Sequence, residues 1–332
     1  MNQAVEASIR KKPKIEIKFI NYQIVLALVL VGLVIFFGLL EDGIMFKPRV
    51  LFGLTANIVE IGLMALPMTF IILTGGIDLS VGSTMALSGI MLGWLYKATG
   101  NIVLAIIISL LTGLACGILN GIIIAKTRIP ALVTTLATYS LYYGIARIIS
   151  GTKIFSQFPK GFALLANNRI FGFLPYQFLL FIFASILFLI AYKKTVIGVY
   201  LRGIGLNEKA IKFAGIDAKK IKLYIYSLSG LVSALAGIVY LMRLPAAKPD
   251  MGINLNIETI TAVVLGGTNI NGGKGSIVGT FTGILILGVL RKGMQLIGLG
   301  GDVYNFILGL VLVICLIGFS LTENNRKKIT AK

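Results

Sequence analysis

Long apolar runs separated by short polar segments occupy most of this sequence. A helix of about 17–25 apolar residues spans a bilayer, and eight runs have such a length: residues 22–40, 53–73, 102–125, 131–150, 174–192, 223–243, 276–297 and 303–320. Two further apolar segments, 80–96 and 257–267, are shorter or interrupted. Because the runs are continuous and do not alternate as barrel strands do, the pattern predicts an all-α polytopic membrane protein. We expect about ten transmembrane helices, some of them broken.

The basic residues between the runs predict the orientation, because loops rich in Lys and Arg stay in the cytoplasm. Residues 1–20 form a basic arm and residues 321–332 a basic tail. The loop 193–222 carries eight lysines and arginines against two carboxylates. With ten spans these three segments fall on one side. We therefore expect both termini and the loop 193–222 in the cytoplasm, with a single transmembrane domain over residues 21–320.

Composition supports the membrane class and excludes others. Hydrophobic residues make up 57% of the 332 residues and charged residues 13%, whereas a soluble domain is nearer one quarter charged. The net charge of +19 comes from bases that fix topology and contact anionic membrane lipid, so no nucleic-acid partner is expected. The sequence has no histidine, and Cys116 and Cys315 each lie inside an apolar run. We expect neither a disulfide nor a metal site.

A short polar segment, LTGGIDLSVGS at residues 73–83, interrupts one of the most apolar stretches. Asp78 at its centre is a charge at membrane depth, which costs on the order of 3 kcal/mol by insertion scales. Backbone at this depth leaves the helix only where protein or a water-filled cavity satisfies it. The segment therefore predicts a helix break or a polar path in the protein interior.

This segment has an internal echo, GGTNINGGKGS at residues 266–276. Both segments read Gly-Gly, any residue, Asp or Asn, Leu or Ile, Ser or Asn, and later Gly-Ser. Glycine-interrupted segments at matching positions of two transporter halves point to the substrate path, so we predict two pseudo-repeated halves. The candidate residues for the translocation path or the helix break are Gly75, Gly76, Asp78, Ser80, Asn269 and Asn271.

Two more polar residues in the predicted spans are candidates for the same role. Asn57 and Glu60 share one helical face at spacing i, i+3. Charges inside membranes usually pair, and Arg147 in a later span is the candidate partner of Glu60.

Small residues at spacing four mark helix packing. Such stripes let two helix backbones approach closely. The stripes are Gly113, Gly117 and Gly121; Ser229, Ser233 and Gly237; and Gly275, Gly279 and Gly283.

No segment carries recognisable enzymatic chemistry. The phosphate-binding loop needs Gly six residues before its Lys and Ser or Thr directly after it. Around Lys274 those positions hold Thr268 and Gly275, so GGTNINGGKGS fails the pattern. No nucleophile with an adjacent base is visible. We expect a chain that is not an enzyme and binds no cofactor, so any ATP used in transport is hydrolysed by other subunits.

The basic loop 193–222 contains the signals of a short helix. Asn207 is a suitable N-cap for a helix from Glu208 to Phe213, and Gly215 would end it. A helix this short is held by what it packs on. Two interpretations are open at this point: the helix rests on a partner protein, or it is solvated or lies on a lipid surface.

Three blocks in this order resemble the permease subunit of ribose/galactose-type ATP-binding-cassette sugar importers. The blocks are MTFIILTGGIDLSVGSTMALSG at residues 68–89; GLNEKAIKFAGI at 205–216, continuing into SLSGLVSALAGIV at 227–239; and TAVVLGGTNINGGKGSIVGTFTGILILGVL at 261–290. With the span pattern, the resemblance covers about residues 20–320.

The resemblance implies a multi-pass permease of a bacterial cytoplasmic membrane that forms the path for a monosaccharide such as ribose. It implies a second permease chain, two cytoplasmic ATPase subunits and an extracytoplasmic sugar-binding protein as partners. The element that couples the chain to the ATPase matches at Asn207, Glu208, Ala210 and Gly215. Lys209 replaces the first alanine of the broader Glu-Ala-Ala…Gly form of other importers, and the spacing to glycine differs. The resemblance favours a partner protein under the short helix. It also implies a position near the cytoplasm for the Asp78 block, so we expect Asp78 to brace the break rather than to contact solute.

Two alternatives stay open. The same importer class also carries furanosyl signalling molecules and nucleosides, whereas amino-acid permeases lack the Gly-Gly-Ile-Asp-Leu-Ser block. An ion-coupled secondary transporter is the alternative from another class. Such coupling usually needs carboxylates at the membrane midplane, and the predicted spans of this chain hold few acids.

Overall fold

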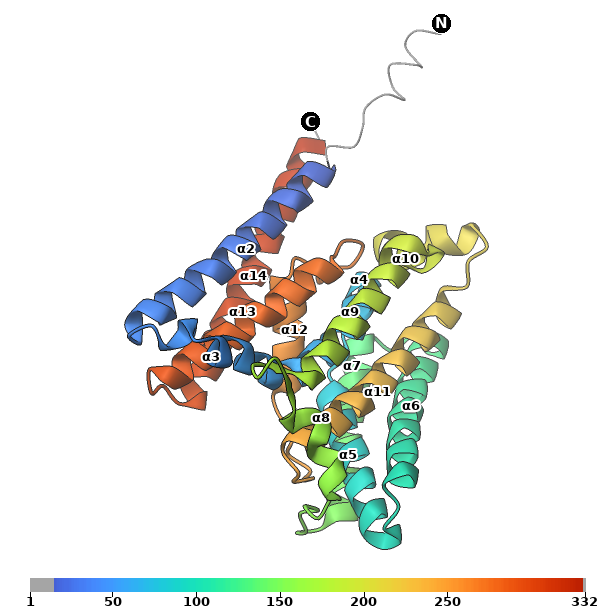
Figure 1. Cartoon of the computed structure of the whole chain (residues 1–332). Coiled ribbons are helices and arrows are strands. Elements are labelled where there is room, and N and C mark those ends of the chain that lie inside the picture. The colour runs from blue at the N-terminus through green and yellow to red at the C-terminus, as the bar shows by residue number, and fades with distance from the viewer. Residues whose placement is uncertain (1–14, 331–332) are drawn as a thin grey trace, which may run out of the picture.

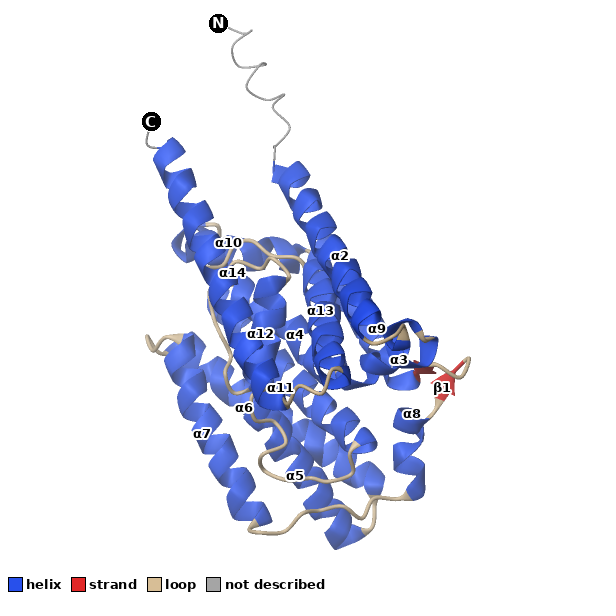
Figure 2. Ribbon diagram, turned by 90° about the vertical axis from the view of Figure 1, so that its left-hand side faces the viewer, coloured by secondary structure: helices blue, strands red, loops and turns tan. Residues whose placement is uncertain are grey.

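A computed structural model describes residues 15–330 of the chain as helices joined by short connections (Figures 1 and 2). Residues 1–14 of the predicted basic arm and residues 331–332 of the predicted tail lie outside this described part. The longer helices are α2 (Ile15–Leu40), α4 (Val59–Leu73), α5 (Val81–Thr99), α6 (Ile102–Lys126), α7 (Ala131–Ser150), α9 (Tyr176–Lys194), α10 (Val196–Phe213), α11 (Ala218–Arg243), α12 (Leu255–Leu265), α13 (Ile277–Leu296) and α14 (Gly301–Thr330).

Short elements fill two of the connections. Three of them lie between α2 and α4, and the others lie between α7 and α9, where two very short strands pair antiparallel. They are the 3-10 helix η1 (Ile44–Phe46), α3 (Pro48–Gly53), η2 (Leu54–Asn57), η3 (Lys160–Ala163), α8 (Leu164–Asn167), β1 (Arg169–Ile170) and β2 (Leu174–Pro175).

Nine of the ten predicted apolar segments each overlap one helix, and the tenth, 53–73, covers η2 and α4. The all-α polytopic class is confirmed. Within residues 15–330, five helices are long and apolar enough to cross a membrane on their own. A sixth crossing arises if α3–η2 and α4, which are bent by 54° at their junction, count as one broken span. The helices α12 and Gly301–Ile317 of α14 are apolar but shorter. The number of ten crossings therefore stays a prediction.

Helix α4 forms the centre of the bundle. All fifteen of its residues are buried, as expected for a helix that is apolar on every side. It packs against α9, α11, α12 and α13. Two buried polar features lie at its ends, namely Glu60 at the start and the Asp78 segment just beyond the end.

The outward faces of the peripheral helices are apolar. Leu39 of α2 is 74% exposed, Ile148 of α7 84% and Phe306 of α14 71%. Contiguous apolar surface of this extent is not kept in water, so these faces contact lipid. In Figure 1, α2, α13 and α14 lie on one side of the molecule, whereas α5, α6 and α11 lie on the other.

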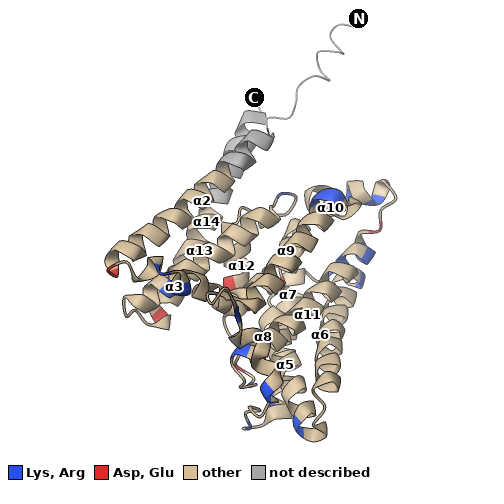
Figure 3. Cartoon of the chain, viewed as in Figure 1, with Lys and Arg blue, Asp and Glu red and all other residues tan. Residues whose placement is uncertain are grey.

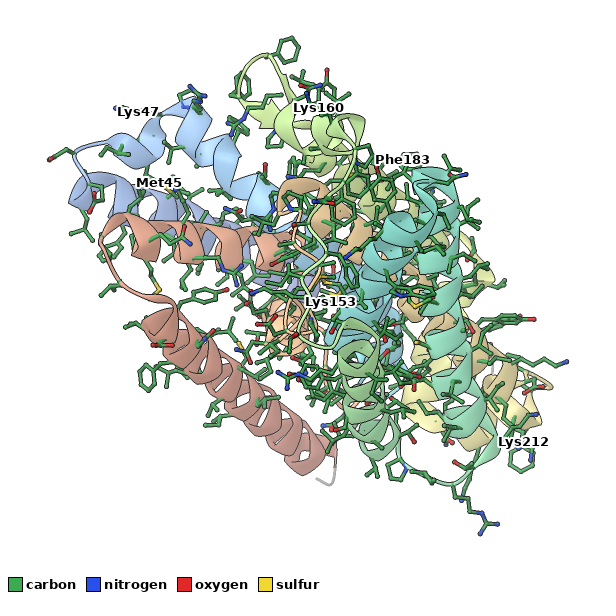
Figure 4. The ribbon with its side chains drawn as sticks, turned by 90° about the horizontal axis from the view of Figure 1, so that it is seen from below. Met45, Lys47, Lys153, Lys160, Phe183 and Lys212 are labelled. Carbon is green, nitrogen blue, oxygen red and sulfur yellow. The ribbon has the colours of Figure 1, made fainter. Side chains whose placement is uncertain are left out.

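The charged residues gather at the ends of the helices (Figure 3). Lys and Arg mark α10 and the adjoining ends of α6 and α11. Helix α2 begins, and α14 ends, toward this same end of the molecule (Figures 1 and 2). In the view from below, Lys212 of α10 lies at an edge far from Lys47 and Lys160 (Figure 4). The described start of α2 and end of α14 thus lie at the same end of the molecule as α10, and the cytoplasmic placement of both termini stays a prediction.

The predicted small-residue stripes are helix contacts. Gly113, Gly117 and Gly121 of α6 lie against the backbone of α11, where a side chain at any of them would overlap main-chain atoms. On α13, Gly279 and Gly283 meet the backbone of α12 in the same way. These contacts bring helices together more closely than larger residues permit.

Candidate functional site

The first glycine segment interrupts the helical structure between α4 and α5. Helix α4 ends at Leu73, and Gly75 has φ of +78°, a conformation that glycine adopts without strain. The chain then runs without helical structure until α5 begins at Val81. The predicted helix break is therefore present, and it presents backbone and polar side chains in the protein interior.

Asp78 is the centre of the break and is only 2% exposed. Its Oδ1 accepts hydrogen bonds from the backbone N–H of Ser80 at 3.0 Å and from Ser80 Oγ at 2.6 Å. Its Oδ2 accepts a hydrogen bond from Ser229 Oγ of α11 at 3.0 Å. The carboxylate thus connects the break to the helix beside it, which is the geometry of a brace.

The network continues from Ser80 into α6 and α7. Asn120 Nδ2 donates to Ser80 Oγ at 2.8 Å, and the Tyr142 hydroxyl donates to Cys116 O at 2.9 Å and lies 3.2 Å from Asn120 Oδ1. Thr135 Oγ1 also donates to the carbonyl oxygen of Ile77 at 3.1 Å. Helices α6, α7 and α11 together hold the first break.

The second glycine segment forms a tight loop between α12 and α13. Asn269 Oδ1 accepts the N–H of Asn271 at 3.0 Å, and Asn269 N–H donates to Lys274 O at 2.9 Å. Gly267, Gly272 and Gly273 all have positive φ. Here the asparagine that matches Asp78 stabilises its own turn, because its side chain bonds two residues onward.

The two glycine segments meet each other and α10. The N–H of Gly273 donates to the carbonyl oxygen of Leu73 at 2.9 Å, and a side chain at Gly272 would lie 2.9 Å from Gly75 N. Gly205 of α10 closes this contact, since a Cβ there would overlap Leu73 O and Gly273 N. We call the contact of Leu73, Gly272, Gly273 and Gly205 the glycine junction.

Helix α10 continues directly from the glycine junction into the predicted coupling element. Asn207 is non-helical (φ −161°, ψ 95°), and its Oδ1 accepts the N–H of Ala210 at 3.1 Å. It therefore caps a new helical segment after a kink. The segment ends at Gly215 (φ +80°) with N–H bonds from Gly215 to Lys212 O and from Ile216 to Ile211 O, the Schellman arrangement. The predicted cap and stop are confirmed.

Glu208 ties this segment to α11. Its carboxylate lies 2.7 Å from Lys222 Nζ, and the Glu208 side chain is 49% exposed. Phe213 at the far end of the segment is 92% exposed. An aromatic side chain so exposed on a short, basic helix is a feature that sequence reasoning missed.

Asn57 and Glu60 lie together at the start of α4, but the predicted partner was wrong. Arg243 at the end of α11, not Arg147, binds both residues: its Nη2 lies 2.7 Å from Glu60 Oε1 and its Nη1 3.0 Å from Asn57 Oδ1. The Arg147 guanidinium instead lies over the ring of Tyr143, 5.4 Å from its centre. Arg147 is in the last turn of α7.

A second buried ion pair lies in the neighbouring helices. Glu258, in the first turn of α12 and 3% exposed, pairs with Arg291 of α13, and the Tyr304 hydroxyl of α14 lies 3.2 Å from its other oxygen. The sequence reasoning did not single out these residues. The available signal was an acidic residue inside an apolar segment, the same signal that drew attention to Asp78.

The candidate residues therefore form two groups, one connected through the glycine junction and one apart from it. The first break joins Gly75, Gly76, Asp78 and Ser80, and the glycine junction connects it to the loop of Asn269 and Asn271 and to the segment at Asn207. Asn57 and Glu60 form a separate group at the other end of α4. Within the described residues, no group of three or more His, Cys, Asp or Glu side chains is placed to hold a metal ion.

Comparison with known proteins identifies the family. The profile described as "Branched-chain amino acid transport system / permease component" matches residues 50–316, which is most of the chain. The chain belongs to this permease family. No solved structure matches the chain significantly.

This chain is similar, along nearly its whole length, to permease proteins of import systems. The chain is 36% identical to the autoinducer 2 import system permease protein LsrD of Photorhabdus temperata, over 91% of this chain and 92% of the relative. It is 35% identical to the protein of that name from Klebsiella pneumoniae, with 91% and 92% covered. The match to the Escherichia coli protein is 34%, with 92% and 94% covered.

These comparisons confirm the resemblance to ATP-binding-cassette importer permeases. The chain is a transmembrane permease subunit of such an importer and, with its apolar helices, a multi-pass protein of the bacterial inner membrane. It acts in transport.

Proposed function

We propose that this permease forms the translocation path for a furanosyl signalling molecule, autoinducer 2, in an importer whose ATP is hydrolysed by separate subunits. The observation that carries this proposal is the sequence identity of 34–36% to autoinducer 2 import permeases over more than 90% of both chains. The sequence motifs alone favour a monosaccharide such as ribose. Ribose is therefore the competing cargo.

The geometry of α10 supports docking on an ATPase subunit. The segment that begins at Asn207 and ends at Gly215 is capped at both ends by its own residues, so its shape does not depend on a partner. Its basic side chains and the exposed Phe213 face away from the bundle. Aromatic side chains of this kind are typical anchors of protein interfaces, and we assign Phe213 to the contact with the ATPase, beside Glu208 and Ala210.

The glycine junction supports a path for the motion. Gly205 lies two residues before the Asn207 cap and contacts the main chain of both glycine segments. A displacement of the docked segment is therefore passed to the first break and to the loop at Asn269 through main-chain contacts. Asp78 and Ser80 then brace the break against α11 while it moves.

The Asn57–Glu60–Arg243 group supports a polar lining for the path. Arg243 has 22% of its side chain exposed although it pairs with a buried glutamate, and charged groups at membrane depth face water-filled cavities or the bundle interior. Sugar hydroxyls both donate and accept hydrogen bonds, which amide, guanidinium and carboxylate groups can supply. We assign this group to the path and Asp78 to bracing.

The proposed assembly has a second permease chain, two cytoplasmic ATPase subunits and an extracytoplasmic binding protein. The clustering of α10 and the helix termini at one end of the molecule supports placing both termini in the cytoplasm with the ATPases. The second permease chain is either a copy of this chain or a related one.

Co-purification tests the assembly. The tagged chain is extracted from its native host in mild detergent, and the proteins that accompany it are identified by mass spectrometry. We expect a stoichiometric ATPase with the Gly-x4-Gly-Lys-Ser/Thr loop, lost on Glu208→Ala with Phe213→Ala. Lys47→Gln, far from α10 (Figure 4), is the matched control. A chain that arrives alone and moves solute in liposomes without ATPase would establish the ion-coupled alternative.

Uptake measurements test the cargo. Cells that lack their own uptake systems receive the complete importer, and depletion of autoinducer 2 and of labelled ribose from the medium is followed. Preferential uptake of autoinducer 2 supports the proposal. Preferential uptake of ribose assigns the chain to the monosaccharide importers and leaves the ATPase proposal intact.

A further inference from the structure

A cavity of about 300 Å³ opens at the α10 end of the molecule beside the first break. The end of α4, the end of α6, the loop into α7 and the start of α11 form its walls. Arg128, Lys219, Lys222, Glu208 and Tyr226 are among its lining residues. Neither the bracing of Asp78 nor the docking of Phe213 gives this cavity a role.

The charges in the cavity are unbalanced. Glu208 is bound to Lys222, which leaves Arg128 and Lys219 without a carboxylate partner among the residues that the structure describes. The local excess of positive charge selects for an anion. The fixed fork of an arginine beside a lysine suits the oxygens of a phosphate in particular.

Tyr226 supplies a buried donor without a partner. The residue is 1% exposed, and its hydroxyl has no hydrogen-bond partner within the described part of the chain. The hydroxyl lies against Gly76, another lining residue, where a Cβ would be 2.6 Å from it. Buried hydroxyls are rarely left unsatisfied, so the cavity lacks an acceptor that a bound group would provide.

The start of α7 adds a further set of donors. Pro130 precedes the first residue of this 20-residue helix and provides no side-chain cap. Pro130 and Ala131 line the cavity. The first N–H groups of a helix have no partner within it and carry partial positive charge, which makes an uncapped start a site for phosphate.

The surface next to the cavity indicates where the phosphate comes from. Leu132, Val133 and Leu136 of α7 are 46%, 55% and 54% exposed, and Ile129 at the cavity itself is 46% exposed. An apolar helix face next to a basic cavity suits a lipid whose headgroup lies in the cavity and whose acyl chains lie along the helix. Basic pockets between transmembrane helices bind anionic headgroups in this way.

We propose that the cavity binds one anionic phospholipid, with its phosphate between Arg128, Lys219 and Tyr226 and its acyl chains along α7. The ligand is a phosphodiester anion, and a free phosphate shares its chemistry without the apolar part. This inference does not depend on which solute the permease carries or on how it is powered.

Native mass spectrometry of the full chain tests the proposal. The purified chain in detergent is equilibrated with phosphatidylglycerol, with phosphatidylcholine of the same acyl chains, or with inorganic phosphate, and the retained molecules are counted. We expect one phosphatidylglycerol per chain that excess phosphatidylcholine does not displace. Arg128→Gln and Lys219→Gln should lower its retention about tenfold, and Tyr226→Phe severalfold.

Two kinds of control accompany these variants. Lys212→Gln changes an exposed lysine of the same end of the molecule outside the cavity (Figure 4) and should retain the lipid as the native chain does. Arg128→Lys keeps the charge and should restore most of the retention, which separates loss of the site from loss of folding.

The opposing outcomes are distinct. Equal retention of the two lipids, or unchanged retention in Arg128→Gln and Tyr226→Phe, would refute the anionic headgroup site. Displacement of phosphatidylglycerol by millimolar inorganic phosphate, with phosphate bound in its place, would show that the cavity takes a free anion and would overturn the lipid assignment.

Discussion

The bracing role of Asp78 can be separated from a role in contacting or coupling to solute by exchanging its carboxylate. Asp78 accepts three hydrogen bonds, two from Ser80 and one from Ser229. Asp78→Ala removes the acceptor and keeps the donors. Asp78→Asn keeps one oxygen of the same geometry and removes the charge. The two substitutions therefore test shape and charge independently.

The structure gives the magnitude for Asp78→Ala. The Ser229 hydroxyl can turn to a carbonyl oxygen of its own helix, as Ser233 does with Ser229 O at 2.8 Å. The N–H and hydroxyl of Ser80 each lose the acceptor that Asp78 Oδ1 gives them. Each unsatisfied buried donor costs about 1–3 kcal/mol, so Asp78→Ala should destabilise the protein by about 2–6 kcal/mol.

Asp78→Asn should cost far less. Its Oδ1 keeps both bonds from Ser80, and its Nδ2 can donate to Ser229 Oγ, which then accepts. Hydrogen bonds to a charged acceptor are stronger than those to a neutral one by about 1 kcal/mol, so Asp78→Asn weakens these bonds. The same substitution removes the free-energy cost of burying a charge. The net change should stay within about 1 kcal/mol.

Thermal unfolding in detergent and solute uptake by the assembled importer measure the two effects. We expect Asp78→Asn to unfold near the temperature of the native chain and to transport at a comparable rate. Asp78→Ala should unfold at a clearly lower temperature and lose transport with its folded fraction. A stable Asp78→Asn chain without transport would refute the bracing argument, because it would show that the carboxylate charge itself is used.

Three further predictions follow from other groups of residues. Gly205→Ala places a Cβ against Leu73 O, and an overlap of this kind costs about 1–3 kcal/mol. We expect the number of ATP molecules hydrolysed per solute transported to rise while the ATPase still co-purifies. An unchanged ratio would contradict the role of the glycine junction in transmitting the movement. Arg243→Met leaves the buried Glu60 charge unpaired and should lower the stability measured by thermal unfolding by about 3–5 kcal/mol. Glu60→Gln in the same chain should restore most of that stability. A double variant as unstable as Arg243→Met would argue against the ion pair. Gly215→Ala strains the left-handed stop by about 1–2 kcal/mol and should weaken ATPase co-purification, whereas Gly215→Asn, which tolerates that conformation, should weaken it less.

Features set by neighbouring residues could be predicted from the sequence. Apolar runs locate helices because continuity of hydrophobic residues is local, and the cap at Asn207 and the stop at Gly215 depend on residues a few positions away. The stripe of Gly113, Gly117 and Gly121 indicated a close helix contact for the same reason.

Partners distant in sequence could not be predicted. Ser229 is 151 residues from Asp78, and Arg243 is 183 residues from Glu60. Arg147 and Arg243 are both arginines near the end of a span, so the sequence offers no criterion for choosing between them. Gly205 begins the block 205–216, but nothing in the sequence indicates its contact with the two glycine segments, because that contact arises only in the folded chain.

The glycine junction is built from main-chain atoms of Leu73, Gly205, Gly272 and Gly273, whereas the group around Arg243 is built from side chains. Substitution of side chains around Arg243 therefore leaves the shape of the junction unchanged. If the proposed roles hold, cargo preference and the transmission of the ATP-driven movement depend on different atoms of the same chain. The same coupling machinery could then serve permeases with different path linings, and substitutions at Asn57 and its neighbours would change specificity without altering Gly205.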